Sequence, residues 1–122
     1  MGVLEYTQLL QSVEMTAGLD RATAERAVEA TLTTLAERIG QDEFAKLAAR
    51  LPNELRETPK QAGADPDPFS PEEFVRRTAR RAGVDESTAW ERIRAVLATL
   101  RQSLAEMEEI RERLQDYDAL MS

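Results

Sequence analysis

The fold of this chain is decided by the stretch Ala17-Gly18-Leu19-Asp20-Arg21-Ala22-Thr23-Ala24, which recurs 65 residues later as Ala82-Gly83-Val84-Asp85-Glu86-Ser87-Thr88-Ala89. The likeness extends on both sides, so that residues 9–39 align with residues 74–104. Most apolar positions in one copy are matched by apolar residues in the other, as the core of a duplicated helical unit requires. The sequence therefore predicts an architecture of two related units. Identical pairs further along include Ala30 with Ala95, Leu32 with Leu97, Thr34 with Thr99 and Leu35 with Leu100.

Composition predicts one compact soluble domain. The chain has 122 residues, of which 42% are apolar and 32% charged, and its net charge is −7. That apolar content is enough for one shared core. No apolar run approaches the roughly 20 residues that span a bilayer, and the first residues lack the basic start of a secretory signal. We therefore expect a cytoplasmic protein without membrane association.

The residue types that most often carry chemistry are scarce. Cysteine and histidine are absent, which removes thiol nucleophiles, cysteine zinc sites and the usual near-neutral proton shuttle. The sequence also lacks a nucleophile–base motif, a glycine-rich phosphate loop and a metal-binding spacing. We expect a protein that is not an enzyme and has no cofactor or metal. Its negative charge makes nucleic acid an unlikely partner, because that attraction depends on basic residues.

The spacing of apolar residues predicts three helices in a first unit, residues 1–57. Gly18 ends the first helix as a C′ glycine does, and Asp20 can cap the second. Gly40 ends the second helix, and Pro52 suits the first turn of a short extra helical segment. The predicted helices span about residues 3–16, 21–39 and 41–50, and the short segment spans residues 52–57.

A segment rich in proline and glycine, residues 58–69, is expected to link this unit to a second one, residues 70–122. Ser70-Pro71-Glu72-Glu73 has the elements of a capping box and predicts the start of the fourth helix. Gly83 ends that helix and Asp85 caps the fifth.

Beyond residue 104 the second copy departs from the first. Ala105 stands where Gly40 interrupts the first copy, so a continuous helix is possible. The apolar spacing slips by one residue between Met107 and Ile110, which allows either a bend into a sixth helix or a rotating stripe on one long helix. We favour the bend, because the first copy folds back at the same place.

These residues resemble the domain-of-unknown-function 2267 family of bacterial proteins, over almost the whole chain. The resemblance implies an all-helical duplicated domain with no established activity. In one departure, Leu114-Gln115-Asp116-Tyr117 stands where the family pattern has Leu-Pro. The matching residues are Val13, Ala17-Gly18-Leu19, Ala24, Leu32, Leu35 and Leu51-Pro52 in the first copy, and Glu73-Phe74, Ala82-Gly83-Val84, Ala89, Ala95-Val96-Leu97 and Leu100 in the second.

One candidate site is an arginine strip on the fourth helix: Arg76, Arg77, Arg80 and Arg81. These residues form two i,i+4 pairs, and arginine forks suit phosphates and acidic partners. The competing interpretation, which we favour, is an ordinary charged face whose arginines meet solvent or carboxylates such as Glu73.

A candidate interface lies in the second unit. Trp90 stands where the first copy has Glu25. This change predicts that the tryptophan is buried, either against the first unit or against another subunit. We favour burial against the first unit. The C-terminal apolar seam of Met107, Ile110, Leu114 and Tyr117 would be available for self-association wherever the first unit leaves it uncovered. The acidic residues around that seam are expected to form an exposed helix face rather than a catalytic or metal site.

The sequence thus predicts an all-α bundle of two tandem pseudo-symmetric three-helix units joined by a Pro/Gly linker. Its expected function is protein–protein interaction or self-assembly, as a homodimer or with an unidentified protein. The alternative is binding of an anionic ligand or nucleic acid through the arginine strip.

Overall fold

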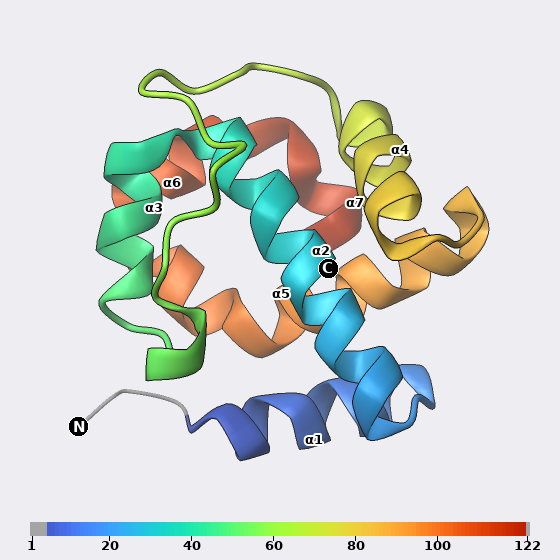
Figure 1. Ribbon diagram of the computed structural model, residues 1–122. Coiled ribbons are helices and arrows are strands. Elements are labelled where there is room, and N and C mark those ends of the chain that lie inside the picture. Colours follow the sequence, from blue (N-terminus) through green and yellow to red (C-terminus); the bar gives the residue numbers. More distant parts are fainter. Residues whose placement is uncertain (1–4, 122) are drawn as a thin grey trace.

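The computed structural model is all-α and describes residues 5–121, apart from the side chains of Asp118 and Met121. No strand occurs within that range, and the predicted start of the first helix at residue 3 lies outside it. The helices and 3-10 turns are α1 (Tyr6–Ala17), α2 (Arg21–Ile39), α3 (Gln41–Ala48), η1 (Asn53–Leu55), α4 (Pro71–Ala82), α5 (Glu86–Ala105), α6 (Glu108–Arg113), η2 (Gln115–Tyr117) and α7 (Asp118–Met121) (Figure 1).

The repeated stretch forms the same turn and cap in both halves. Gly18 and Gly83 end α1 and α4 in the left-handed region, with φ of 68° and 70°. Asp20 and Asp85 each accept a hydrogen bond from a backbone amide three residues ahead, at 2.8 and 2.7 Å. Both predicted turns and both predicted caps are confirmed. These turns and caps end one helix and begin the next, and so fix the direction of α2 relative to α1 and of α5 relative to α4.

The chain bends between α5 and α6. Met107 is extended, with φ −107° and ψ 91°, so α6 starts a new direction and the continuous helix does not form. The bend confirms the expectation drawn from the slip in apolar spacing. The 3-10 turn η2 then follows α6 as η1 follows α3, although Gln115 stands where the first half has Pro52.

Each half of the chain covers the second helix of the other half. Helix α1 packs against α5, and α4 packs against α2 as well as α5 (Figure 1). The Thr99 hydroxyl donates to Ser12 Oγ at 3.1 Å across the first of these contacts. The Thr78 hydroxyl donates to Thr34 Oγ1 at 2.9 Å across the second. The largest fully buried side chains, drawn from both halves, include Leu9, Leu35, Ile39, Phe44, Leu47, Phe74, Ile93, Leu97, Leu104 and Tyr117.

The segment predicted as a linker packs against the molecule. In Figure 1 it is the green trace that passes α2 and α3 before crossing to α4. The Gln41 amide donates to the Gly63 carbonyl at 2.9 Å, and the Asp67 amide donates to the Glu37 carbonyl at 3.1 Å. Phe69 is buried at the end of the segment. Residues 58–69 therefore join the two halves and also cover the C-terminal end of α2.

Gly40 permits this close approach. Its φ of 89° lies in the region that favours glycine, and a Cβ there would lie only 3.0 Å from the Pro66 nitrogen. Within residues 5–121, no helix combines the length and the apolar character needed to cross a membrane.

Candidate functional site

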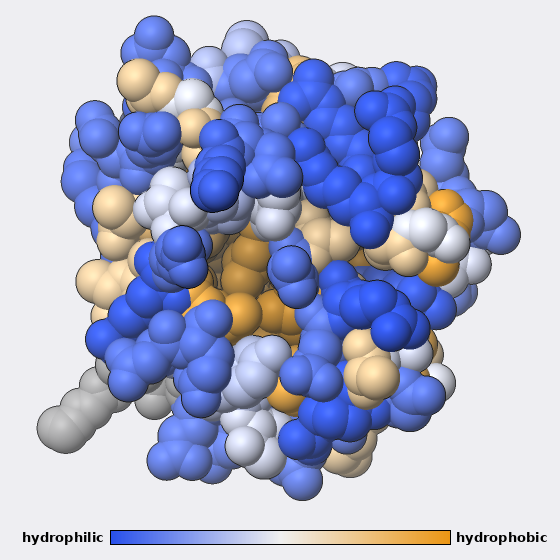
Figure 2. Space-filling view, viewed as in Figure 1, coloured by the Kyte–Doolittle hydropathy of each residue, from blue (hydrophilic) through white to orange (hydrophobic). Residues whose placement is uncertain are grey.

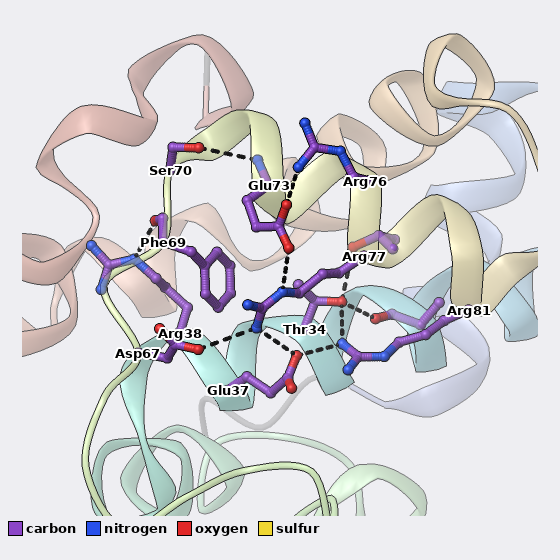
Figure 3. Close-up of polar contacts among 12 residues, drawn as sticks. Thr34, Glu37, Arg38, Asp67, Phe69, Ser70, Glu73, Arg76, Arg77 and Arg81 are labelled. Carbon is purple, nitrogen blue, oxygen red and sulfur yellow. Dashed lines mark hydrogen bonds and ion pairs between the residues drawn. The ribbon is translucent and has the colours of Figure 1, made fainter.

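The arginine strip meets carboxylates from three parts of the chain, with Arg77 at the centre (Figure 3). Arg77 Nε donates to Glu73 Oε2 on the same helix at 2.8 Å. Its Nη1 lies 3.3 Å from Asp67 Oδ2 and 3.5 Å from Glu37 Oε1, and its guanidinium lies 4.1 Å from the centroid of the Phe69 ring. The hydrogen bond between Arg77 and Glu73 lowers the pKa of Glu73 and raises the pKa of Arg77.

Arg81 also turns inward. Its Nη1 lies 2.7 Å from Glu37 Oε1 and donates to Thr34 Oγ1 at 2.8 Å. Thr34 is buried and also accepts the hydrogen bond from Thr78, so the three side chains join α4 to α2. The charges of Arg77 and Arg81 are therefore largely compensated, and the two residues help to hold the fold.

Arg76 and Arg80 form the outer edge of the strip. Arg76 pairs with Glu73. Arg80 is exposed and makes no ion pair with any residue that the structure describes. The hollow beside them carries both signs of charge, so an anion there would meet carboxylates together with arginines. Its lining residues are Glu37, Asp67, Glu73, Arg77, Arg80 and Arg81.

The C-terminal seam belongs to the core. Ile110, Leu114 and Tyr117 are 0, 5 and 0% exposed, and the Tyr117 ring meets Phe74 edge to face with centroids 5.5 Å apart. These three residues offer no surface to a partner in this fold, which corrects their place in the candidate interface. The cause is the bend at Met107, which turns α6 and η2 toward the rest of the molecule.

Tyr117 forms hydrogen bonds with the end of residues 58–69, which we call the crossing segment. Its hydroxyl is shared between the carbonyl oxygens of Phe69 and Ser70, at 2.9 and 3.2 Å. Arg38 Nε donates to the same Phe69 carbonyl at 3.1 Å. Burial raises the pKa of Tyr117 to about 12. Its role here is structural.

Trp90 and Met107 are half-buried and pack against the core. Part of the Trp90 side chain therefore packs within the molecule and part of it reaches the surface. Of the large apolar side chains in the described part of the chain, Met15 on α1 is the strongly exposed one, at 85%. A single exposed apolar residue is common on protein surfaces and does not define a site.

A second hollow, which the sequence did not indicate, opens between α2, the start of α1 and the chain around η1. We call it the acid-rimmed hollow. Its floor is apolar and includes Leu32 and Phe44, and Figure 2 shows this orange floor within a ring of blue side chains. Its lining residues are Tyr6, Glu25, Glu29, Leu32, Thr33, Phe44, Glu54, Leu55, Glu57, Thr58, Pro59, Lys60 and Gln61.

The rim of this hollow is strongly negative. Glu25 and Glu29 lie one turn apart on α2, and Glu54 and Glu57 lie in and just after η1. None of these four exposed glutamates has an ion pair with a residue in the range 5–121. The pKa of Tyr6 is raised first by burial and then by the charges of Glu25, Glu54 and Glu29.

One sequence signal could have pointed to the hollow. Glu25 and Glu29 are like charges at i,i+4, an arrangement that destabilises a helix unless something compensates it. Arg21, one turn before Glu25, offsets part of this repulsion, and Glu29 has no ion pair among the described residues. The sequence could not show that Glu54 and Glu57 face this pair, because that depends on how the chain returns after α3.

Carboxylates also meet between α3 and α6. Lys46 Nζ lies 3.2 Å from Glu43 Oε1 and 3.8 Å from Glu109 Oε2. A hydrogen bond between the two carboxyl groups lowers the pKa of Glu43 and raises the pKa of Glu109. Among the side chains that the structure describes, no three or more from histidine, cysteine, aspartate or glutamate gather closely enough to hold a metal ion.

Comparison with known proteins identifies the family. Residues 6–120 match the family described as uncharacterized conserved protein (DUF2267). The chain belongs to the DUF2267 family. This agrees with the resemblance seen in the turns and helix ends, and the DUF2267 description attaches no activity to them. Neither a curated protein nor a solved structure matches the chain significantly.

Proposed function

We propose that this DUF2267 domain is a non-enzymatic interaction module that binds a protein partner at the acid-rimmed hollow. The observation that carries the proposal is an apolar floor left open between α2 and η1 and framed by four glutamates without ion pairs in the described range. The lack of histidine and cysteine supports a role without catalysis. The lack of cysteine also fits the cytoplasmic location that we propose.

The proposal includes two tandem pseudo-symmetric units of three helices. Support comes from the matched caps at Asp20 and Asp85, the matched turns at Gly18 and Gly83, and the recurring order of helices and 3-10 turns.

Site-specific photo-crosslinking in cells tests the interaction. A photoreactive residue at Gln61, on the rim of the hollow, is expected to give discrete adducts with a partner. The same residue at Ser87, exposed near the start of α5 and outside the hollow, is the matched control. No adduct at Gln61, or the same adducts at both positions, would contradict the proposal.

Light scattering at two protein concentrations tests whether the partner is a second copy. Self-assembly through the hollow predicts a mass that rises with concentration in the native protein. A Thr33→Lys variant, which places a cation in the hollow one turn from Glu29, is expected to remain monomeric.

A second candidate function, binding of an anionic ligand or nucleic acid by the arginine strip, is favoured by the exposed Arg80. Reversal of Arg77 or Arg81 would not test it cleanly, because both residues hold Glu37. The variant Arg76→Glu/Arg80→Glu changes the outer edge instead. Anion binding predicts salt-sensitive affinity that this variant loses, and unchanged affinity for a phosphate-rich probe would reject it.

A further inference from the structure

We infer that the acid-rimmed hollow takes a basic amphipathic peptide segment of its partner, with one apolar side chain on the floor and lysine or arginine residues on both sides. This inference rests on the proposed function and names the chemistry of the partner.

The glutamates come in two rows from different elements, and both rows line the hollow together with apolar residues. Glu25 and Glu29 make one row along α2, and Glu54 and Glu57 make the other. Glu25 and Glu29 are four residues apart on α2 and therefore share one helix face, whereas Glu54 lies in η1 and Glu57 lies just after it. A short helix laid between the rows could therefore present basic side chains to both while an apolar side chain enters the floor near Leu32.

Lysine and arginine suit this rim because each has an apolar stem and a charged end. The stem can lie on the Leu55 side of the floor while the head reaches a carboxylate in water. Charge complementarity of this kind gives a partner its register and speeds its approach.

The four rim glutamates, of which Glu25 accepts a hydrogen bond from Tyr6, form no ion pair with a described residue, in contrast to other carboxylates of the molecule. Glu37 and Glu73 bind arginines of α4, and Glu43 binds Lys46. At the hollow, two like charges at i,i+4 on α2 face further carboxylates with Lys60 as the one basic lining residue among those described. This arrangement weakens the isolated chain and is relieved when a cationic partner binds.

Other occupants fit less well. An anion is repelled by the rim. A polyamine satisfies the charges and has no branched apolar group to fill the floor. A second copy of this chain carries a net charge of −7 and is repelled at long range.

Fluorescence polarisation with a defined probe tests the inference. The probe is a labelled 12-residue amphipathic helix of leucine and lysine, compared with the same peptide in which glutamate replaces lysine. We expect the lysine peptide to bind and the glutamate peptide not to bind. Binding should weaken as salt rises, because the rim charges are exposed.

Two isosteric double variants locate the binding. Glu25→Gln/Glu29→Gln removes one row and is expected to weaken binding by about fivefold or more, in line with the strength of exposed ion pairs. The control Glu108→Gln/Glu112→Gln changes the same residue type at the same spacing on the exposed face of α6. It is expected to change binding by less than about twofold. Thr33→Lys, which fills the hollow with a cation of the chain itself, should abolish binding in a folded protein.

Equal loss in both double variants would show general attraction to an acidic protein and overturn the inference. If spermine bound more tightly than the lysine peptide and displaced it fully, the occupant of the hollow would be a polyamine and not a peptide. If Gln61 gave adducts in cells but the lysine peptide did not bind, the proposed protein-binding function would be supported. The inference that the partner segment is basic would be rejected.

Discussion

Glu37 is the residue that joins the arginine strip to α2. Its side chain is 16% exposed and lies near the guanidinium groups of both Arg77 and Arg81. Glu37→Gln is expected to lower the free energy of unfolding by about 1 to 3 kcal/mol, between the values for exposed and buried ion pairs. Urea unfolding at pH 7 measures the change.

Glu112→Gln on the exposed face of α6 is the control and should change stability by less than about 0.5 kcal/mol. If Glu37→Gln behaved like this control, the contacts of Arg77 and Arg81 with Glu37 would contribute nothing measurable to the stability of the fold.

The raised pKa of Tyr117 predicts that the free energy of unfolding falls at alkaline pH. Its pKa is raised by burial from 10.0 to about 12 in the folded protein. Between these two values the unfolded chain releases the phenolic proton while the folded chain retains it. The stability that the raised pKa of Tyr117 contributes to the folded protein is therefore complete below about pH 10, and it is lost as the pH rises to about 12. Unfolding curves at pH 9, 10 and 11 measure this slope.

Tyr117→Phe removes the proton and the hydrogen bonds to Phe69 and Ser70. We expect it to lower stability by about 1 to 2 kcal/mol at pH 7 and to flatten the slope between pH 10 and 12. An unchanged slope in the variant would assign the alkaline transition to other groups.

At the scale of elements, the connection between α2 and α3 depends on Gly40. Gly40→Ala must place a side chain at φ 89° and within 3.0 Å of the Pro66 nitrogen. Gly18→Ala meets a similar φ, 68°, with nothing within 4 Å of the new Cβ. We expect a cost of about 1 kcal/mol at Gly18 and more than about 2 kcal/mol at Gly40. Thermal unfolding of the two variants measures the difference.

Equal costs at the two glycines would mean that backbone conformation alone matters and that the segment 58–69 moves aside easily. A larger cost at Gly40 would show that the crossing segment is held against α2.

The helix ends were predictable because their signals are local. Gly18 and Asp20 act within a few residues of themselves, so the sequence is sufficient to place the turn and the cap. The bend at Met107 was also visible, as a slip in apolar spacing. The capping box at Ser70 is half formed: Ser70 Oγ accepts from the Glu73 amide, while the Glu73 side chain binds arginines.

The sites were less predictable because they depend on contacts far apart in the chain. The sequence shows that Ile110 and Tyr117 are apolar and evenly spaced, and it does not show which helices cover them. The acid-rimmed hollow forms only when residues 54–61 return beside α2. Like-charge spacing at Glu25 and Glu29 was the one local sign of it.

At the scale of the whole molecule, the first helix of each half packs against the second helix of the other half, α1 against α5 and α4 against α2. We call this arrangement the exchange of first helices, and it predicts that neither half folds alone. Residues 1–69 lack α5, which covers α1, and residues 70–122 lack α2, which covers α4. We expect each half, made separately, to show little helix by circular dichroism, and an equimolar mixture to regain it. A stable helical half on its own would contradict the shared core.

The exchange of first helices also bears on how the protein is made. The hydrogen bond between Ser12 and Thr99 joins residues 87 positions apart, so α1 leaves the ribosome long before its partner helix exists. At about 5 to 20 residues per second, the wait lasts on the order of ten seconds. During that time α1 can pack against α2 of its own half, and the part of its apolar face that α5 covers stays exposed. The final packing of α1 therefore waits until most of the chain has been made.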